Sequence, residues 1–287
     1  MKTLIEAVVV IAVLAALTPA ISAQWPSTPT PRVPRTPTGQ TNLTAPAPRT
    51  ADGKPDLSGI WDNGRNTGGA RGGAATLGLG TTAPPPAAND GPPSATFFNV
   101  GAGFKEGLPF QGWAAELVKK RMADNSKDNP DAHCLPMGFM QFHTHSQPRK
   151  IIQTPDLLLI IYEANSGLRQ IFMDGRPLPG KDAEPWWYGY SVGKWEGDTL
   201  VVETTGFIDN IWLDVRGSPL TGAGKVIERF RRVNYGNLEI EITVDDPKTY
   251  TKPWTVKVSQ RIYPDTELIE FICEDRDATH YVGATTK

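Results

Sequence analysis

The sequence predicts an all-β protein whose antiparallel strands close into a calycin- or lipocalin-like barrel, with one helix and long disordered N-terminal stretches. From residue 148 onward, apolar and polar residues alternate with a period of two. Short turn signals such as TPD, EGD and NYGN separate the alternating runs, and no helical pattern lies between them. A long antiparallel meander would leave exposed edges, and closure into a barrel removes them.

Residues 1–23 are expected to be a secretory signal peptide. Lys2 precedes an apolar run over 7–17 that is too short to span a bilayer comfortably. Ala23 ends a stretch of small residues that is typical of a signal-peptide cleavage site. The alternative is a retained N-terminal anchor. No later stretch has the length of a membrane helix, so we expect a secreted or periplasmic protein without membrane association after cleavage.

Residues 24–50 are rich in Pro and Thr and predict an extended, mobile linker. Residues 51–287 then form a single β-barrel domain, interrupted over 64–104 by a Gly/Ala/Pro-rich low-complexity insertion. Disorder is the expectation for this insertion, a lid is the alternative, and Phe97 and Phe98 are candidates for docking it.

The first strand is expected within DLSGIWDN (56–63), which arrives directly after the linker. A helix follows over 111–124, where Trp113, Leu117 and Met122 form one apolar stripe with Ala114 and Val118. The remaining strands are expected at 149–153, 157–164, 168–175, 186–195, 199–207, 225–234, 237–246, 254–263 and 267–275.

The hairpin YSVGKWEGDTLVVETTGF (190–207) is dense in acidic residues, but its tip needs them for local reasons. Gly197 supplies a positive φ, and Glu196 and Asp198 are expected to be exposed turn residues. Only Glu203 is left without a local explanation.

The net charge argues against nucleic acid as a partner, and the two cysteines predict a disulfide. The formal net charge of −2 gives no basic excess for nucleic acid. Cys134 and Cys273 are the only cysteines, and in an exported protein they predict one disulfide, the alternative being two separate buried thiols.

Several motifs resemble, as a set, a large group of secreted bacterial proteins of unknown function. They include LSGIW (57–61), WEGDTLVVET (195–204) and the pattern DP-x-x-Y-x-x-PW (246–254). The resemblance runs from about residue 50 to 280 and implies no particular activity. This chain has Leu178, Glu274 and Asp275 where typical members carry a histidine or a His–Glu pair.

Two sets of side chains could carry chemistry. His143 and His145 would share one face of a strand, and with His133 they could bind a metal; the alternative is polar, partly exposed histidines. Glu163, Glu203, Arg169 and Asp174 are the candidates for acid/base catalysis, the alternative being cross-strand charge pairs on a solvated face. The pattern also places Glu228 on one face with Val226 and Phe230.

The expected function is binding of an apolar or aromatic small molecule at the barrel mouth, through Trp186, Trp187, Tyr188 and Trp212. The alternative is a barrel enzyme of lyase, isomerase or hydrolase type that uses acid/base carboxylates, with metal assistance through His143 and His145. A structural surface protein is the third class, if the leader is retained. No cofactor is required by any motif in the sequence.

Overall fold

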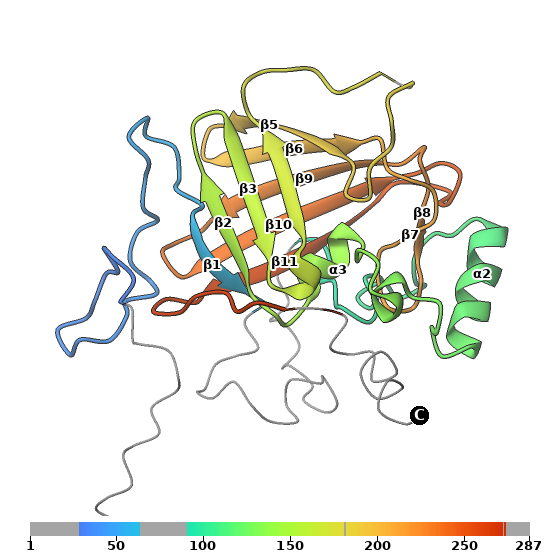
Figure 1. The fold of residues 1–287 in the computed structure, drawn as a ribbon, viewed down its shortest axis with the longest axis horizontal. Coiled ribbons are helices and arrows are strands. Elements are labelled where there is room, and N and C mark those ends of the chain that lie inside the picture. The colour runs from blue at the N-terminus through green and yellow to red at the C-terminus, as the bar shows by residue number, and fades with distance from the viewer. Residues whose placement is uncertain (1–28, 64–90, 181, 272, 274–287) are drawn as a thin grey trace, which may run out of the picture.

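The computed structural model describes residues 29–63, 91–180, 182–271 and 273, and its centre is a closed barrel of nine strands (Figure 1). The expected signal peptide and most of the low-complexity insertion lie outside these residues. The barrel strands, in chain order, are β1 (Gly59–Asp62), β2 (Arg149–Gln153), β3 (Leu157–Tyr162), β4 (Leu168–Phe172), β5 (Tyr190–Glu196), β6 (Thr199–Thr205), β9 (Lys225–Arg232), β10 (Asn237–Asp245) and β11 (Trp254–Ile262).

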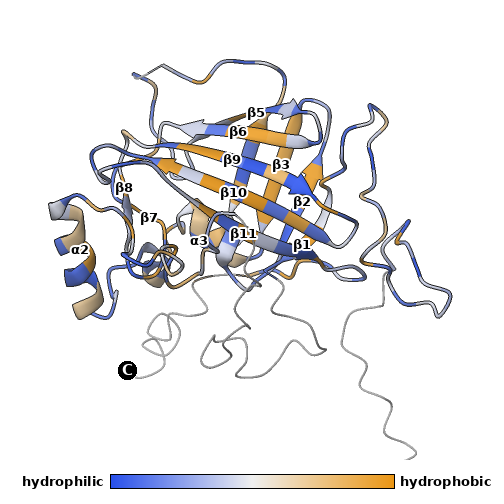
Figure 2. Ribbon diagram, turned by 180° about the vertical axis from the view of Figure 1, so that it is seen from behind, coloured by the Kyte–Doolittle hydropathy of each residue, from blue (hydrophilic) through white to orange (hydrophobic). Residues whose placement is uncertain are grey.

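The period-two alternation in the sequence sorts side chains into the barrel and out of it. In β10, Leu238, Ile240, Ile242 and Val244 are fully buried, whereas Glu241 between them is exposed. Figure 2 shows the resulting mixture of hydrophobic and hydrophilic positions along the barrel strands. The predicted closed β-barrel is therefore confirmed.

Two details of the predicted sheet are wrong. β4 and β5 pair in parallel, with Ile171 and Phe172 of β4 beside Ser191 and Val192 of β5, so the barrel is mixed and not purely antiparallel. The described part of 267–275 is not a strand. The short strand β1 pairs with both β11 and β2 and so closes the barrel, which leaves no free edge for a further strand.

Two α-helices lie among the described residues, α2 (Gly112–Ala123) and α3 (Phe139–Thr144), whereas the sequence predicted only α2. All six side chains of α3 are buried, and this short helix closes one end of the barrel (Figure 1). Its sequence, FMQFHT, is too short and too evenly buried to show a helical period. The predicted apolar stripe of α2 is not buried as expected: Trp113 and Met122 are 49% and 43% exposed.

The chain before the barrel covers its opposite end. Tyr235 and Gly236, in the turn between β9 and β10, donate backbone hydrogen bonds to the carbonyls of Ala45 and Leu43 at 2.8 Å each. Arg49 forms an ion pair with Asp198 at the tip of the β5–β6 hairpin. Residues 29–50 thus differ from an extended mobile linker, since they are held against the barrel turns.

The remaining elements connect these parts. A two-stranded sheet is formed by β7 (Ile211–Trp212) and β8 (Pro219–Leu220), and two 3-10 turns lie at Pro130–His133 and Ala164–Ser166. Cys134 and Cys273 form a disulfide, with their Cα atoms 5.4 Å apart. Among the residues described, none of the helices has the length and apolar character needed to cross a bilayer.

Candidate functional site

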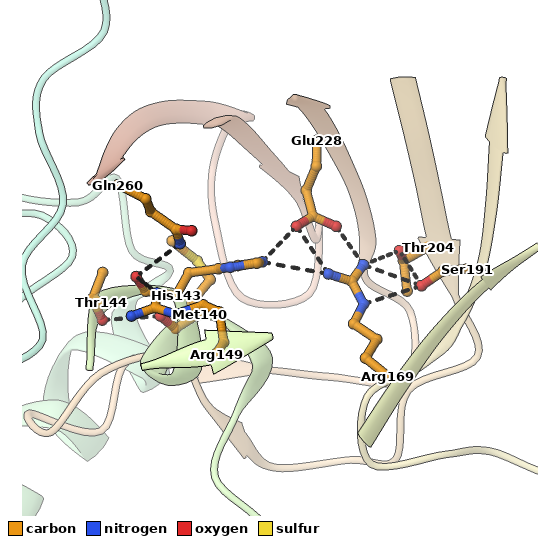
Figure 3. A network of polar contacts seen from close by, with 9 residues as sticks. All are labelled: Met140, His143, Thr144, Arg149, Arg169, Ser191, Thr204, Glu228 and Gln260. Carbon is orange, nitrogen blue, oxygen red and sulfur yellow. Dashed lines mark hydrogen bonds and ion pairs between the residues drawn. The ribbon is translucent and has the colours of Figure 1, made fainter. Parts of the chain in front are cut away.

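An ion pair between Arg169 and Glu228 lies inside the barrel (Figure 3). Arg169 comes from β4 and Glu228 from β9, and each occupies an inward position of its strand, between apolar neighbours. The guanidinium binds the carboxylate through two nitrogens, Nη1 to Oε1 at 3.0 Å and Nη2 to Oε2. Both side chains are almost completely buried, at 1% and 0% exposure, so the pair is formed away from water.

Two hydroxyl groups complete the coordination of the Arg169 guanidinium. Its Nη2 donates to Ser191 Oγ at 3.1 Å and to Thr204 Oγ1 at 3.0 Å, and its Nε donates to Ser191 Oγ at 3.3 Å. Ser191 and Thr204 face each other across the β5–β6 pair. A buried guanidinium needs such acceptors, because an unpaired buried donor costs free energy.

His143 reaches the same carboxylate from helix α3. Its Nε2 lies 2.9 Å from Glu228 Oε1. An ionised carboxylate can only accept, so this contact assigns the proton to Nε2 and leaves Nδ1 as an acceptor with a lone pair. The carboxylate thereby fixes both the orientation and the tautomer of the imidazole, which is the role of the acid in a carboxylate–histidine pair.

Arg149 holds the C-terminal end of α3 in place. Its Nη1 donates to the His143 carbonyl at 2.7 Å, and its Nη2 donates to the carbonyls of His145 at 3.0 Å and Gln147 at 3.2 Å. The last carbonyls of a helix lack intrahelical partners and carry partial negative charge, so a cation is favourable there. This contact fixes the backbone from which the His143 ring projects.

Burial and pairing set the charges of the site. Burial lowers the pKa of His143, against the opposing effect of Glu228, so the imidazole is neutral at neutral pH. Burial alone would raise the pKa of Glu228, but Arg169 and the hydrogen bond from His143 outweigh it and hold that pKa at about 2. Burial raises the pKa of Tyr162 to about 12, so its hydroxyl keeps its proton.

Several buried polar atoms around His143 have no hydrogen-bond partner among the residues that the structure describes. His143 Nδ1 and the Tyr162 hydroxyl are two of them, and their rings lie 6.1 Å apart. The positive charge of Arg169 acts on the Tyr162 hydroxyl and partly offsets the effect of burial on its pKa. The two groups make no hydrogen bond of good geometry. Arg149 Nε and Gln260 Oε1 are also unpartnered. Such atoms are rare in folded proteins, and a group of them around one residue is characteristic of a functional site or of internal water.

The network can supply a base and a proton donor. His143 Nδ1 is an unprotonated nitrogen oriented by Glu228, and Tyr162 is a protonated hydroxyl. Ser191 and Thr204 bind Arg169 and lie on the side of the network away from His143 Nδ1. Within the described part of the chain, no hydroxyl nucleophile is therefore paired with the base. At 1% exposure of His143 the site is closed in this conformation.

Of the four predicted acid/base residues, the structure places only Arg169 in the network. Glu163 is buried and accepts a backbone hydrogen bond from Ile269 at 2.9 Å. Glu203 pairs with Lys225 at 2.6 Å, and Asp174 pairs with Arg176, both with partly exposed side chains. The Glu203–Lys225 pair matches the alternative of a cross-strand charge pair. The Asp174–Arg176 pair is local and lies in the loop that follows β4.

The four residues of the predicted aromatic ligand site differ in exposure and in what they pack against. Trp186 is 43% exposed and packs beside Tyr190 at 5.3 Å between ring centroids, whereas Trp187 and Tyr188 pack partly against the core. Trp212 is buried under the guanidinium of Arg121, which lies 4.2 Å from its ring centroid. Of the four, only Trp186 is thus largely exposed.

The three histidines do not form a metal site. The prediction that His143 and His145 share a face of a strand is wrong, because His143 lies in α3 and His145 follows its end. His133 lies in an exposed 3-10 turn, where its Nε2 is 2.9 Å from the Lys127 carbonyl. Across the described residues, no group of three or more His, Cys, Asp and Glu side chains is placed to hold a metal ion.

Sequence reasoning did not select Glu228, Ser191, Thr204, Tyr162 or Arg149 as site residues. A signal existed for Glu228, since the alternation already placed it on the Val226 and Phe230 face, which is the buried one. Its partners come from other strands and from α3, so only the register brings them together.

Comparison with known proteins adds no assignment. The chain matches no protein-family model, no curated protein and no solved structure.

Proposed function

We propose that the protein is an exported barrel enzyme of lyase or isomerase type, which moves a proton to or from a small molecule bound inside the barrel. His143 would act as the base through Nδ1, with Glu228 orienting it, and Tyr162 would donate a hydrogen bond or a proton. The Tyr162 hydroxyl would also stabilise negative charge that develops on the substrate, since Glu228 already neutralises Arg169. Export is supported by the signal-like leader and by the disulfide.

One observation carries this proposal: the unpartnered His143 Nδ1 of an imidazole whose other nitrogen is bound to Glu228. A network that served only to hold α3 would be complete with Arg149 on the helix end and with the Arg169–Glu228 pair. It would not need a buried lone pair and a buried hydroxyl without partners, since each costs free energy.

The network favours lyase or isomerase chemistry over hydrolysis through a covalent intermediate, because the hydroxyls of Ser191 and Thr204 are bound to Arg169 and not to the base. The expected binder at the barrel mouth has weaker support, because Trp187, Tyr188 and Trp212 already pack against other side chains. A substrate can enter only when an element at one end of the barrel moves, and α3 is the element that carries His143.

The test is exchange of carbon-bound protons in deuterium oxide. The purified protein is incubated with a panel of small hydroxy acids, keto acids and enones, and proton NMR follows loss of the signal next to the carbonyl. We expect exchange of at least one compound, slowed about 100-fold or more in His143→Gln. Tyr162→Phe should also slow it and should fold, since its hydroxyl makes no hydrogen bond of good geometry.

His133→Gln is the matched control, because His133 is an exposed histidine outside the barrel. It should exchange at the wild-type rate. The proposal fails if the wild type exchanges no compound above the rate in buffer. It also fails if a folded His143→Gln or Tyr162→Phe protein keeps the full rate.

A further inference from the structure

Helix α2 lies beside the barrel, buries Ala114 and Val118, and is hydrogen-bonded to the rest of the protein at both ends. At its beginning, Trp113 Nε1 donates to the Lys248 carbonyl at 2.8 Å, and Gln111 N donates to the Thr249 carbonyl at 2.7 Å. Towards its end, Arg121 Nη1 donates to the Gly217 carbonyl at 2.6 Å. Figure 1 shows α2 standing away from the strands, in agreement with the exposure of Trp113 and Met122.

A cleft of about 590 Å³ lies between the middle of α2 and residues 99–110. Leu108 and Phe110 line it from the loop, and Ala115, Val118 and Met122 line it from the helix. Its volume falls within the range of roughly 300–1,000 Å³ that is usual for small-molecule sites. The cleft shares no residue with the interior network.

The charged side chains on this cleft are predominantly positive. Lys119 and Arg216 line it together with one acid, Glu106. Arg216 Nε lies against the sulfur of Met122 at 2.9 Å, which places this cation beside the apolar lining. Lys119 has an acidic neighbour, Glu116, at 3.7 Å, but both are highly exposed and such pairs are weak. A partly apolar cleft with excess positive charge favours a ligand that is both apolar and anionic.

We infer that this cleft binds a small amphiphilic anion, namely an aromatic ring system or short alkyl chain that carries a carboxylate or sulfonate. The apolar part would lie against Leu108, Phe110 and Val118, and the acid would face Arg216 and Lys119. This inference does not depend on the proposed function, because it concerns a different part of the molecule.

The test uses the dye anilinonaphthalene sulfonate, an aromatic anion whose fluorescence rises in apolar surroundings. Titration of the full-length protein should give saturable binding. Ala115→Trp should abolish it, because Ala115 is exposed and a larger side chain there fills the cleft without disturbing the core. Arg216→Gln should weaken it about tenfold, the factor that corresponds to about 1.4 kcal/mol.

Lys119→Gln and Lys120→Gln form a matched pair of neighbours. Lys119 lines this cleft, whereas Lys120 lines a smaller one of about 220 Å³ that also includes Asp124 and Asp128. Only Lys119→Gln should reduce the affinity. Equal effects of both variants, or tight binding to anionic vesicles in place of the dye, would show a general basic surface and overturn the inference. Dye binding that a folded Ala115→Trp protein retains would overturn it too, as would no saturable binding at all.

Discussion

Glu228 accepts hydrogen bonds from two partners of different charge, the Arg169 cation and the neutral His143 ring. Because all three side chains are almost completely buried, each depends on the others for its charge state. Removal of one member of a buried ion pair typically costs about 3–5 kcal/mol, since it leaves a charge uncompensated. Loss of any one of these three side chains should therefore destabilise the folded protein.

The pH dependence of unfolding should report His143. Its pKa is lowered in the folded state, so below the unfolded value of 6.5 the unfolded chain binds a proton that the folded protein does not. The free energy of unfolding should therefore fall as pH drops from about 6.5, by up to about 1.4 kcal/mol per pH unit. Glu228 adds a second loss between 4.5 and its folded pKa of about 2. Urea unfolding between about pH 7 and about pH 5 measures the first loss.

His143→Gln should flatten the dependence above about pH 5, because it removes the buried imidazole. An unchanged slope in His143→Gln would contradict the assigned protonation state.

For single residues, the sequence predicted Arg169 as a site residue and placed Glu228 on the face of Val226 and Phe230. It did not predict that the two side chains meet. Outward pairs such as Glu203 with Lys225 and Arg231 with Glu239 carry the same residue types. Which carboxylate faces a cation inside the barrel depends on strand register and on the insertion of α3, and neither can be read from spacing along the chain.

Helix α3 is the element that positions the network, and its entry is controlled by Gly138. A Cβ atom at residue 138 would lie 1.9 Å from the backbone carbonyl oxygen of Trp212. This neighbour belongs to the backbone and cannot turn aside as a flexible side chain could. The close approach, and not an unusual φ angle, explains why glycine occupies this position.

Gly138→Ala should lower the free energy of unfolding by about 1–3 kcal/mol, the usual cost of forcing extra volume into a packed site. Gly112→Ala is the matched control, since nothing lies within 4 Å of a Cβ at the first residue of α2. It should leave stability unchanged or raise it by up to about 1 kcal/mol. Thermal unfolding followed by circular dichroism measures both, and equal melting temperatures would contradict the role given to Gly138.

At the scale of elements, the alternating runs predicted eight of the nine barrel strands from residue 148 onward, and DLSGIWDN predicted β1. The parallel β4–β5 pair was missed because a long connection does not reveal in which direction the next strand runs beside the previous one. The tip of the β5–β6 hairpin has Gly197 at φ 60°, as its turn chemistry predicted. Asp198 in that turn is exposed as expected but also binds Arg49, a contact distant in sequence.

At the scale of the whole molecule, one covalent bond joins the segment before α3 to the chain that follows the last strand. Cys134 and Cys273 are separated by 139 positions in the sequence. In chain-entropy terms, a crosslink across so long a loop removes much freedom from the unfolded chain. The bond therefore acts on the unfolded state more than on any contact in the barrel.

The double variant Cys134→Ser/Cys273→Ser should lose about 2–5 kcal/mol of unfolding free energy. Urea unfolding with and without a reducing agent measures this loss, and the reduced wild type should match the variant. Equal midpoints for the oxidised wild type and the variant would contradict the stabilising role.

The closing strand β1 also has a consequence for the order of folding. Trp61 pairs with Ile262, so the barrel is sealed by two segments from nearly opposite ends of the chain. The β2–β3, β5–β6 and β9–β10 hairpins can form from neighbouring residues as soon as these are available, whereas the β1–β11 contact must first close a very long loop. Contacts between residues so far apart in the sequence form late, so the barrel is completed only after most of the chain has been made. Until then the edges of β1 and β11 are open to pairing with other chains, and the interval before closure is the period of greatest aggregation risk.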